Sequence, residues 1–540
     1  MPNYLQTWAW AIRPCWHYIG FWATLNGMRY FLGAIIFLFL LLSVVVKAFD
    51  EGLAYSTLLG GELADEAVAA AVDENGRFYI TGRTQSTMFP AGQAASWCQN
   101  GTRMNANERG LGQWCAASHG ISHGIDVYVA RLSADGFALD YLFWFYATNA
   151  SDIDEAFDMA VDAEGAAYVV GHTRSADFCT IFGTVPGYDT SYNDNGDAFL
   201  LKVRPDGSGL EFCTFLGGTD WDLATAVSLS PSGQIYVTGG TWSTDFPVSD
   251  GSQHHGLRDL FVATFDSSGT QLEQATLVGG SGQEESRGLV LDEAGRLYVT
   301  GWTNSADFPT NPNSYDHDYG GGFDAFVLQL APDLSLGYGT YVGGSDEDRP
   351  TGLAIAVDGT ATIVGYTRSA DDFPVTTTAV YQGGSDIFLV QLAPDGTTLP
   401  FATLAGGEGD DWANGVAAEN GRFWLTGETW SAGWVEETAV AGYDRTANGS
   451  ADGFLLQISP DNPQPITYAS YLGGSAEDRG GAVAIAHNHA FLAGDTRSAD
   501  FPLTAGSFSQ TPSGDYDIYL TKLPLPAGER VYYLFLPVVR

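Results

Sequence analysis

A unit of about 60 residues is repeated seven times between residues 52 and 523, and this repetition constrains the fold more than any other feature of the chain. The clearest copy, from Ala275 to Leu334, reads ATLVGG, an acidic turn, GLVLDEAGRLYVTGWTNSADFP, a loop and DAFVLQLAPDL. A G-x-T-x-S segment recurs at Gly82, Gly171, Gly239, Gly301, Gly365, Gly427 and Gly494. A strand that opens with aspartate follows each segment, at Asp126, Asp197, Asp259, Asp324, Asp386, Asp452 and Asp517. Such a period predicts a propeller, a solenoid or an array.

Each unit contains four short segments that are rich in Val, Leu, Tyr and Phe, as β-strands are. In the fourth copy they are LEQATLV, RGLVLD, RLYVTGW and DAFVLQL. Four antiparallel strands repeated seven times predict an all-β fold, a single seven-bladed β-propeller over residues 52–524. The repeats begin near residues 53, 139, 209, 271, 336, 399 and 466. A linear β-solenoid is disfavoured because its repeats would be much shorter.

The repeated motifs resemble those of a known family, the bacterial SBBP (seven-bladed β-propeller) repeat proteins. The segments that carry the resemblance are LGG at residues 59–61, 216–218 and 472–474, the AVD-x-x-G-x-x-YVTG core, SADFP, and DAFV-x-x-L-x-PDG. They cover nearly all of the chain beyond residue 52. Blade two departs from the pattern, with ATN at residues 147–149 in place of LGG and Cys179 in place of the proline. The resemblance implies the fold and a location outside the cytoplasm, but no particular activity.

The lengths of the connections predict the strand order within a blade. The AVD-type strand is expected at the axis, followed outward by the YVTG-type, DAFV-type and YLGG-type strands. Tight turns then gather on one face, and the long loops with SADFP gather on the other, where binding is expected. The chain starts with an outer strand, 53–59, and ends with a third strand, 517–523. The first strand is therefore predicted to complete the last blade and remove its open edge, with VYYLFLP near the C-terminus as its competitor.

Charge excludes some classes of partner. The formal net charge is −41, from 64 acidic and 23 basic side chains. Nucleic-acid binding requires a basic surface, so it is excluded, and so is docking on anionic lipid. An acidic surface fits a secreted protein or one that binds cations. We expect a monomer.

The N-terminal part, residues 1–48, is predicted to be a leader. It contains the apolar run 30–46, YFLGAIIFLFLLLSVVV, between Arg29 and Lys47. The run has the length of a signal peptide core or of a short membrane anchor, and both readings place the repeats outside the cytoplasm. Because Met28-Arg29 could itself begin a signal peptide, residues 1–27 could be an over-extended gene start. The apolar tail 525–540 is predicted to form a strand.

Four cysteines follow the leader, in two local pairs. Cys98 and Cys115 flank an insertion in blade one, whereas Cys179 and Cys213 both belong to blade two. An even number of locally paired cysteines predicts the disulfides Cys98–Cys115 and Cys179–Cys213 in an oxidising compartment. Free buried thiols are the alternative for the second pair.

One acidic residue precedes the innermost strand of every blade. These residues, called the acid set below, are Asp65, Asp154, Asp222, Glu284, Asp348, Asp411 and Asp478. Converging carboxylates at the channel entrance would suit calcium, a possible cofactor. The alternative is structural, with each carboxylate accepting backbone N–H groups of its own Gly-Gly turn or of a neighbouring blade. The segment 193–197, NDNGD, resembles part of a calcium loop but lacks the later glutamate of an EF-hand.

The insertion in blade one, between Met88 and Asp126, breaks the repeat and is therefore a candidate ligand site. It carries Trp97, Trp114, Arg103 and Arg109, which could recognise a glycan or a protein. No hydrolase, zinc-protease or nucleotide-binding motif occurs in the chain. The sequence thus predicts a secreted or cell-surface binding or scaffold module for an extracellular protein or glycan. The alternatives are a polysaccharide-acting propeller enzyme and a calcium-stabilised adhesion or surface-layer component.

Overall fold

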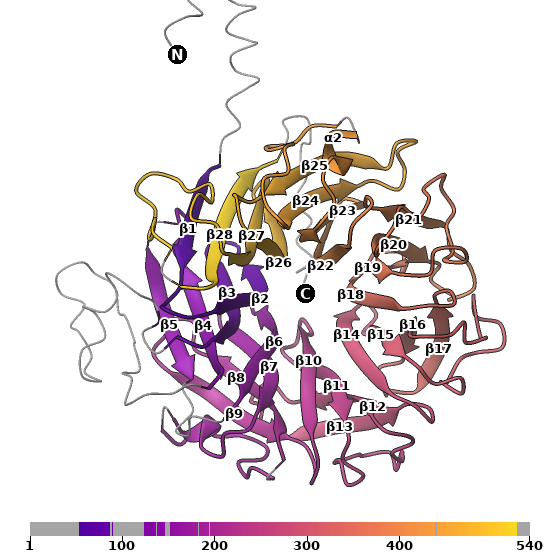
Figure 1. Ribbon diagram of the computed structural model, residues 1–540. Helices are drawn as coiled ribbons and strands as arrows, with labels where there is room; N and C mark the ends of the chain where they lie inside the picture. Colours follow the sequence, from indigo (N-terminus) through magenta and orange to yellow (C-terminus); the bar gives the residue numbers. More distant parts are fainter. Residues whose placement is uncertain are drawn as a thin grey trace, which may run out of the picture. The chain divides into compact units, whose positions relative to one another are not determined.

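The computed structural model describes residues 53–525, apart from 87–88, 90–123, 137, 146–151, 182, 194, 438–439 and 513. The chain divides into two compact units, Met1–Gly52 and Leu53–Arg540, and all described residues belong to the second. These residues form seven four-stranded antiparallel sheets around a central axis (Figure 1). The predicted all-β, seven-bladed propeller is confirmed.

The four strands of each blade have equivalent positions around the ring. The innermost strands are β2 (Asp65–Val72), β6 (Asp154–Val161), β10 (Asp222–Leu229), β14 (Glu284–Leu291), β18 (Asp348–Ile355), β22 (Asp411–Glu419) and β26 (Asp478–Ala486). The second strands are β3 (Phe78–Thr84), β7 (Ala167–Thr173), β11 (Ile235–Thr241), β15 (Leu297–Thr303), β19 (Ala361–Thr367), β23 (Arg422–Thr429) and β27 (His489–Thr496). The third strands are β4 (Asp126–Leu132), β8 (Asp197–Val203), β12 (Asp259–Phe265), β16 (Asp324–Leu330), β20 (Asp386–Leu392), β24 (Asp452–Ile458) and β28 (Asp517–Pro524). The outermost strands are β5 (Leu139–Phe145), β9 (Leu210–Leu216), β13 (Leu272–Val278), β17 (Leu336–Val342), β21 (Phe401–Ala405), β25 (Ile466–Leu472) and β1 (Tyr55–Leu59).

The first strand closes the ring, as its phase in the repeat predicts. β1 pairs with β28 from Tyr55 opposite Lys522 to Leu59 opposite Ile518, so blade seven has the order β26-β27-β28-β1. The hydroxyls of Ser56 and Thr521 also share a hydrogen bond of 2.9 Å. The competing segment 531–537 lies outside the described residues.

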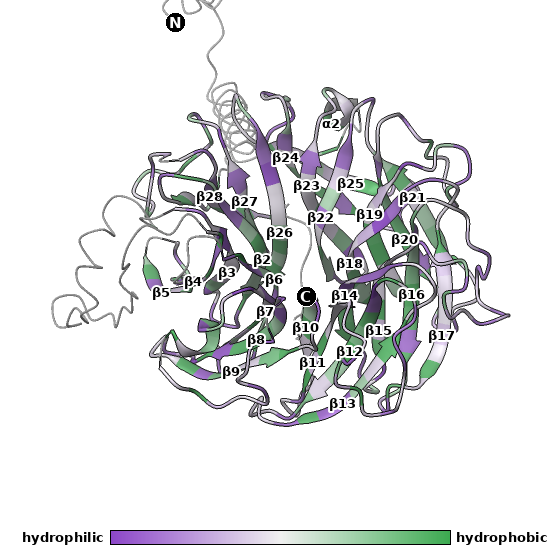
Figure 2. Ribbon diagram, turned by 60° about the horizontal axis from the view of Figure 1, so that its bottom comes forward, coloured by the Kyte–Doolittle hydropathy of each residue, from purple (hydrophilic) through white to green (hydrophobic). Residues whose placement is uncertain are grey.

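Seven apolar layers hold the blades together, one between each pair of neighbours. Figure 2 shows hydrophobic residues concentrated along the strands. The phenylalanine of each SADFP-type segment lies in one of these layers, where it packs on an aromatic ring from the third strand of the same blade. Phe246 and Phe261, for example, have ring centroids 4.6 Å apart within the layer between blades two and three. Burying such rings contributes roughly 1.5–3 kcal/mol each, so the repeated aromatic positions supply much of the cohesion of the ring.

The long loops between second and third strands protect the outer edges of the blades. In blades two to seven the loop returns along the outermost strand and pairs with it, for example through Ser249 N–H to Ala275 O (2.9 Å) and Asn311 N–H to Gly339 O (3.0 Å). In blade two the predicted disulfide Cys179–Cys213 is confirmed, and it ties this loop to β9 with 5.3 Å between the Cα atoms. The other predicted pair, Cys98 and Cys115, lies outside the described residues. Covered edges are less able to pair with a second molecule.

The two faces of the ring differ as the connections predict. The tight turns between first and second strands and between third and outermost strands lie on one face, called the turn face here. The Gly-Gly turns and the long loops lie on the other, called the loop face, which is where the innermost strands begin. Within the described part of the chain, no helix is long and apolar enough to cross a membrane.

Candidate functional site

The acid set lies at the loop face, at the first residue of each innermost strand, but its side chains are buried between strands. Glu284 in blade four shows the arrangement. Its carboxylate accepts hydrogen bonds from the Thr303 hydroxyl (2.7 Å), the Ser305 hydroxyl (2.5 Å) and the N–H of Gly280 (3.0 Å). Thr303 and Ser305 belong to the G-x-T-x-S segment, and Gly280 belongs to the Gly-Gly turn. A single carboxylate therefore joins the second strand of blade four, the loop after it and the crossover turn that enters from blade three.

The same network recurs around the ring. Six of the seven acids accept the N–H of the glycine four residues earlier, and blade two, which lacks LGG, is the exception. All seven acidic residues are fully buried: Asp65, Asp154, Asp222, Glu284, Asp348, Asp411 and Asp478. None of them lines the cavity at the axis. These contacts match the structural alternative considered for the acid set. Calcium binding stays a prediction, and among the described residues no group of three or more His, Cys, Asp or Glu is arranged to hold a metal.

Burial also perturbs the titration of these carboxyls. Desolvation raises the pKa of Asp222 to about 7, against the opposing effect of its hydrogen bonds, and the nearby Asp197 raises it further. The aspartate that opens the third strand of one blade is the second acid for the acid-set carboxyl of the next blade. A Cβ on Gly343 would lie 2.8 Å from Asp348 Oδ2 and 3.0 Å from Asp324 Oδ1, so only glycine fits between that pair. The first glycine of the Gly-Gly turn is required because two carboxylates approach it.

A second set of seven residues, three positions after the acid set, does face the axis. In every blade the innermost strand contains one residue that has no partner in the second strand, which is a β-bulge. These residues, called the bulge set, are Val68, Phe157, Thr225, Arg287, Thr351, Asn414 and Gly481. All seven line one cavity of about 430 Å³ at the axis. The bulge set thus decides what the central channel presents to a ligand.

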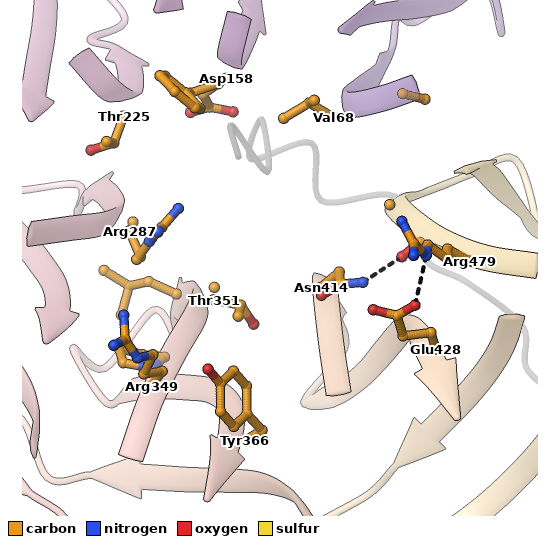
Figure 3. Close-up of a pocket in the computed structure, with 18 of the residues that line it drawn as sticks. Val68, Asp158, Thr225, Arg287, Arg349, Thr351, Tyr366, Asn414, Glu428 and Arg479 are labelled. Carbon is orange, nitrogen blue, oxygen red and sulfur yellow. Dashed lines mark hydrogen bonds and ion pairs between the residues drawn. The ribbon is translucent and has the colours of Figure 1, made fainter. Parts of the chain in front are cut away.

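The wall of this cavity is chemically uneven (Figure 3). Blades one to three contribute Val68, Phe157, Asp158 and Thr225. Blades four to seven contribute the charged and planar side chains Arg287, Arg349, Tyr366, Asn414, Glu428, Arg479 and Asp495. Contacts with a neighbouring blade fix some of these groups: Asn414 donates to the backbone carbonyl of Gly480 (3.0 Å), and Arg479 pairs with Glu428 (3.0 Å). The polar wall is therefore held in a defined geometry.

Arginines outnumber acids in the part of this wall that blades four and five form. Glu285 pairs with both Arg258 (2.5 Å) and Arg287. Glu347 likewise pairs with both Arg349 and Arg368. Burial is the main cause that lowers the pKa of Arg258, and the nearby Arg287 and Arg349 lower it further although Glu285 raises it. Guanidinium groups that repel one another at this range mark a locally positive site.

Two aromatic clusters flank the cavity on the loop face. In the first, the Trp302 ring lies between the guanidinium groups of Arg258 (4.7 Å) and Arg349 (4.4 Å), and Trp242 lies on the other side of Arg258 (4.7 Å). Trp221 continues this cluster, 5.9 Å from Trp242, and is 37% exposed.

The second cluster joins Tyr366 of the cavity wall to Trp412 (5.6 Å), which contacts Trp430 (5.3 Å). Trp430 is 38% exposed. Along the chain, each of these rings is next to a member of the acid set or to the threonine that pairs with it. All of them therefore lie at the loop-face end of the blades. The mouth of the channel therefore carries exposed indoles beside fixed ion pairs.

The residues that the sequence singled out in the blade-one insertion, Trp97, Trp114, Arg103 and Arg109, lie outside the described residues. Sequence reasoning did not find the bulge set, the arginines at the channel mouth or the two aromatic clusters. The signal was present as a difference in length, because β10 has eight residues and its partner β11 has seven. An extra residue in every innermost strand requires a bulge.

Comparisons with known proteins agree with the repeat. Residues 273–309, from β13 through β15 to the proline of SADFP, match the family model of the SBBP β-propeller repeat. Regulatory protein FlaEY of Caulobacter vibrioides is 25% identical over 347 residues, which are 61% of this chain and 35% of that protein. The match thus spans about a third of the length of this curated relative.

Solved structures show only distant likeness. A protein of unknown function from Dyadobacter fermentans is 11% identical, with a TM-score of 0.40 over 88% of this chain and 99% of its own. An ulvan lyase of polysaccharide lyase family PL25 is 10% identical, with a TM-score of 0.42 over 87% of this chain and 95% of its own. Likeness at this level carries no argument about function. The match to the SBBP repeat model and the seven blades together support a β-propeller repeat family for this chain.

Proposed function

We propose that this protein is a carbohydrate-binding propeller that acts outside the cytoplasm, with the loop face around the channel mouth as its contact surface. The observation that carries the proposal is the pair of aromatic clusters that flank the cavity. Each contains a partly exposed indole: Trp221 in one, against which His172 (4.9 Å) and Arg174 (4.6 Å) also lie, and Trp430 in the other.

Chemistry supports a sugar ligand at this surface. One face of a pyranose ring presents C–H groups that pack on an indole, and its hydroxyls need donors and acceptors in fixed positions. The ion pairs of Arg479 with Glu428 and of Arg349 with Glu347 offer both beside the aromatic rings. Binding sites commonly combine apolar walls with a few oriented polar groups in this way.

The location outside the cytoplasm is supported by two features of the chain. The apolar run 30–46 has the composition of an export signal or anchor. Cys179 and Cys213 form a disulfide, and disulfides persist mainly in oxidising compartments. An extracellular protein remains the other partner class for the same surface.

A glycan array tests the proposal. The purified protein should bind a subset of glycans, and the variants Trp221→Ala and Trp430→Ala should each lose at least about tenfold in affinity, since removing an aromatic anchor of a binding site costs roughly 2 kcal/mol or more. Val357→Ala is the control, because Val357 is 68% exposed in a tight turn of the turn face. If the protein bound no glycan but captured a protein through the same tryptophans, protein binding would replace this proposal.

A second candidate function is polysaccharide cleavage, and Glu428 favours it. Burial raises the pKa of Glu428 to about 7, against the opposing effect of Arg479, and the carboxyl lines the cavity. A carboxyl that is protonated near neutral pH can act as a general acid. Release of shorter saccharides by the wild type, lost in Glu428→Gln with binding retained, would support this function. Binding with no release from any bound polysaccharide would count against it.

A further inference from the structure

We propose that the glycan recognised by the loop face is acidic, and that Arg287 and Arg349 bind its anionic group at the mouth of the channel. This inference rests on the proposed function and specifies its ligand class as a saccharide that carries carboxylate or sulfate. It is argued from the charges and exposures of the arginines in blades four and five.

The first step is the local charge balance. Four arginines of blades three to five, Arg258, Arg287, Arg349 and Arg368, share two glutamates, Glu285 and Glu347. These six side chains carry a formal charge of +2, in a chain whose net charge is −41, whereas the three acids on the rest of the cavity wall, Asp158, Glu428 and Asp495, lie in other blades. Guanidinium groups repel one another, so gathering them beside a cavity costs stability unless an anion binds there. A positive site inside an acidic protein is a selective feature, because the rest of the surface repels anions.

The second step is to ask which guanidinium groups can reach a ligand. Arg258 is fixed: its side chain is 7% exposed, it donates to Glu284 O (2.9 Å), and it lies between Trp242 and Trp302. Arg287 projects from the bulge into the cavity with 41% of its side chain exposed. Arg349 lines the same cavity at 24% exposure and is oriented by Trp302 and Phe323, each 4.4 Å away.

The third step is the shape of the site. A planar guanidinium binds a carboxylate or a sulfate through two parallel hydrogen bonds, and a second guanidinium from the next blade can close around the same group. Tyr366 lines the cavity next to Arg349, its partner in the strand pair, and leads to the aromatic cluster of Trp412 and Trp430. An acidic sugar could therefore place its anionic group on Arg287 and Arg349 while the neighbouring sugar packs on aromatic rings.

The surrounding negative charge further narrows the class of ligand that can bind. A densely charged polyanion such as nucleic acid would be repelled along most of its length, whereas a saccharide with spaced acidic groups presents one of them at a time. A peptide of aspartate and glutamate has the anionic groups but no ring to pack on the tryptophans. The two aromatic clusters beside Arg349 therefore favour an acidic glycan over such a peptide.

The test measures selectivity with the full-length protein. The probes are acidic oligosaccharides, each paired with its neutral counterpart: uronate oligomers with their methyl esters, and sulfated oligomers with their desulfated forms. We expect the wild type to bind at least one acidic member about tenfold tighter than its neutral pair, and Arg287→Gln and Arg349→Gln to reduce that ratio towards one. The carboxylate and sulfate arms show which anion is preferred.

Arg368→Gln is the matched control. Arg368 is also 41% exposed and also pairs with a glutamate, but it does not line the cavity, so the ratio should stay within about twofold of the wild type. Circular dichroism of all variants checks the fold. Glycans bound with equal affinity in acidic and neutral forms would overturn this inference and leave the proposed function standing. Binding of polyglutamate with the same dependence on Arg287 would overturn the assignment to a glycan, and failure of all glycans would overturn both proposals.

Discussion

The acid set and the bulge set occupy the same seven strands, three residues apart, and they follow opposite rules. The acid set is chemically uniform, six aspartates and one glutamate, and every member is fully buried and hydrogen-bonded to the threonine or serine of the G-x-T-x-S segment of its blade. The bulge set contains Val, Phe, Thr, Arg, Thr, Asn and Gly, and all its members line the channel. A position that has the same chemistry in every repeat serves the structure of the blade. A variable position beside it determines what the ring can bind.

The largest effect is expected when a member of the acid set is removed. Asp222→Ala leaves the N–H of Gly218 and the hydroxyl of Ser243 buried without the acceptor that binds them at 2.7 and 2.9 Å. Each orphaned group costs about 1–3 kcal/mol, so the free energy of unfolding should fall by roughly 3 kcal/mol. Urea denaturation measures this. Glu293→Ala, at an exposed turn, is the control and should change stability by less than about 0.5 kcal/mol. A change in Asp222→Ala as small as in the control would mean that the carboxylate does not hold the turn.

The next effect follows from the raised pKa values. The pKa of Asp222 rises from 3.8 to about 7 on folding, chiefly through burial, and Asp65 and Asp154 rise similarly. Between pH 4 and 7 the folded state thus holds protons that the unfolded state has released. The stabilisation is complete below the unfolded pKa and is lost as pH rises through the folded pKa. The melting temperature should be higher at pH 5 than at pH 8.

Asp222→Asn sharpens the pH comparison. Its amide cannot release a proton, so the drop in melting temperature between pH 5 and pH 8 should be smaller than in the wild type. A melting temperature that rises with pH would contradict this account of the acid set.

The smallest effect is expected in the bulge set. Val68→Thr changes a half-buried channel side chain to a polar one of similar size, and the free energy of unfolding should change by less than about 0.5 kcal/mol. The neighbouring Ala69→Thr should cost about 1–3 kcal/mol, because Ala69 is 1% exposed in an apolar layer, does not line the cavity, and the larger side chain overpacks it. Equal losses in the two variants would show that the bulge does not separate channel from core.

The sequence predicts the fold well because its signals are repeated. Strand order and closure follow from the phase of the repeat, in which an outer strand at 53–59 precedes the first innermost strand at Asp65. The acid set could be located, and its hydrogen bonds to the Gly-Gly turn could be named, because Asp65 and its six equivalents share one chemistry. Calcium binding at these acids and ligand binding at Trp97 stay predictions.

The channel residues could not be predicted in the same way. Arg287 and Asn414 share no chemistry with each other, so inspection of repeated residues passes over them. Their convergence depends on a bulge and on the curvature of the ring, which bring side chains from distant blades to one cavity. The pairing of two arginines with Glu285 has the same origin, since Arg258 and Arg287 come from different blades.

Closure of the ring through β1 also determines the order in which the molecule can fold. Blades one to six are each built from consecutive strands, so each can form as soon as its own segment exists. Ser56 must instead wait for Thr521, its partner 465 residues later, and contacts of such separation form slowly. Until then β28 has an unpaired edge, and the nearly complete ring is exposed to aggregation. The seven repeats are alike in structure, but the last is the only one whose folding must wait for both ends of the propeller.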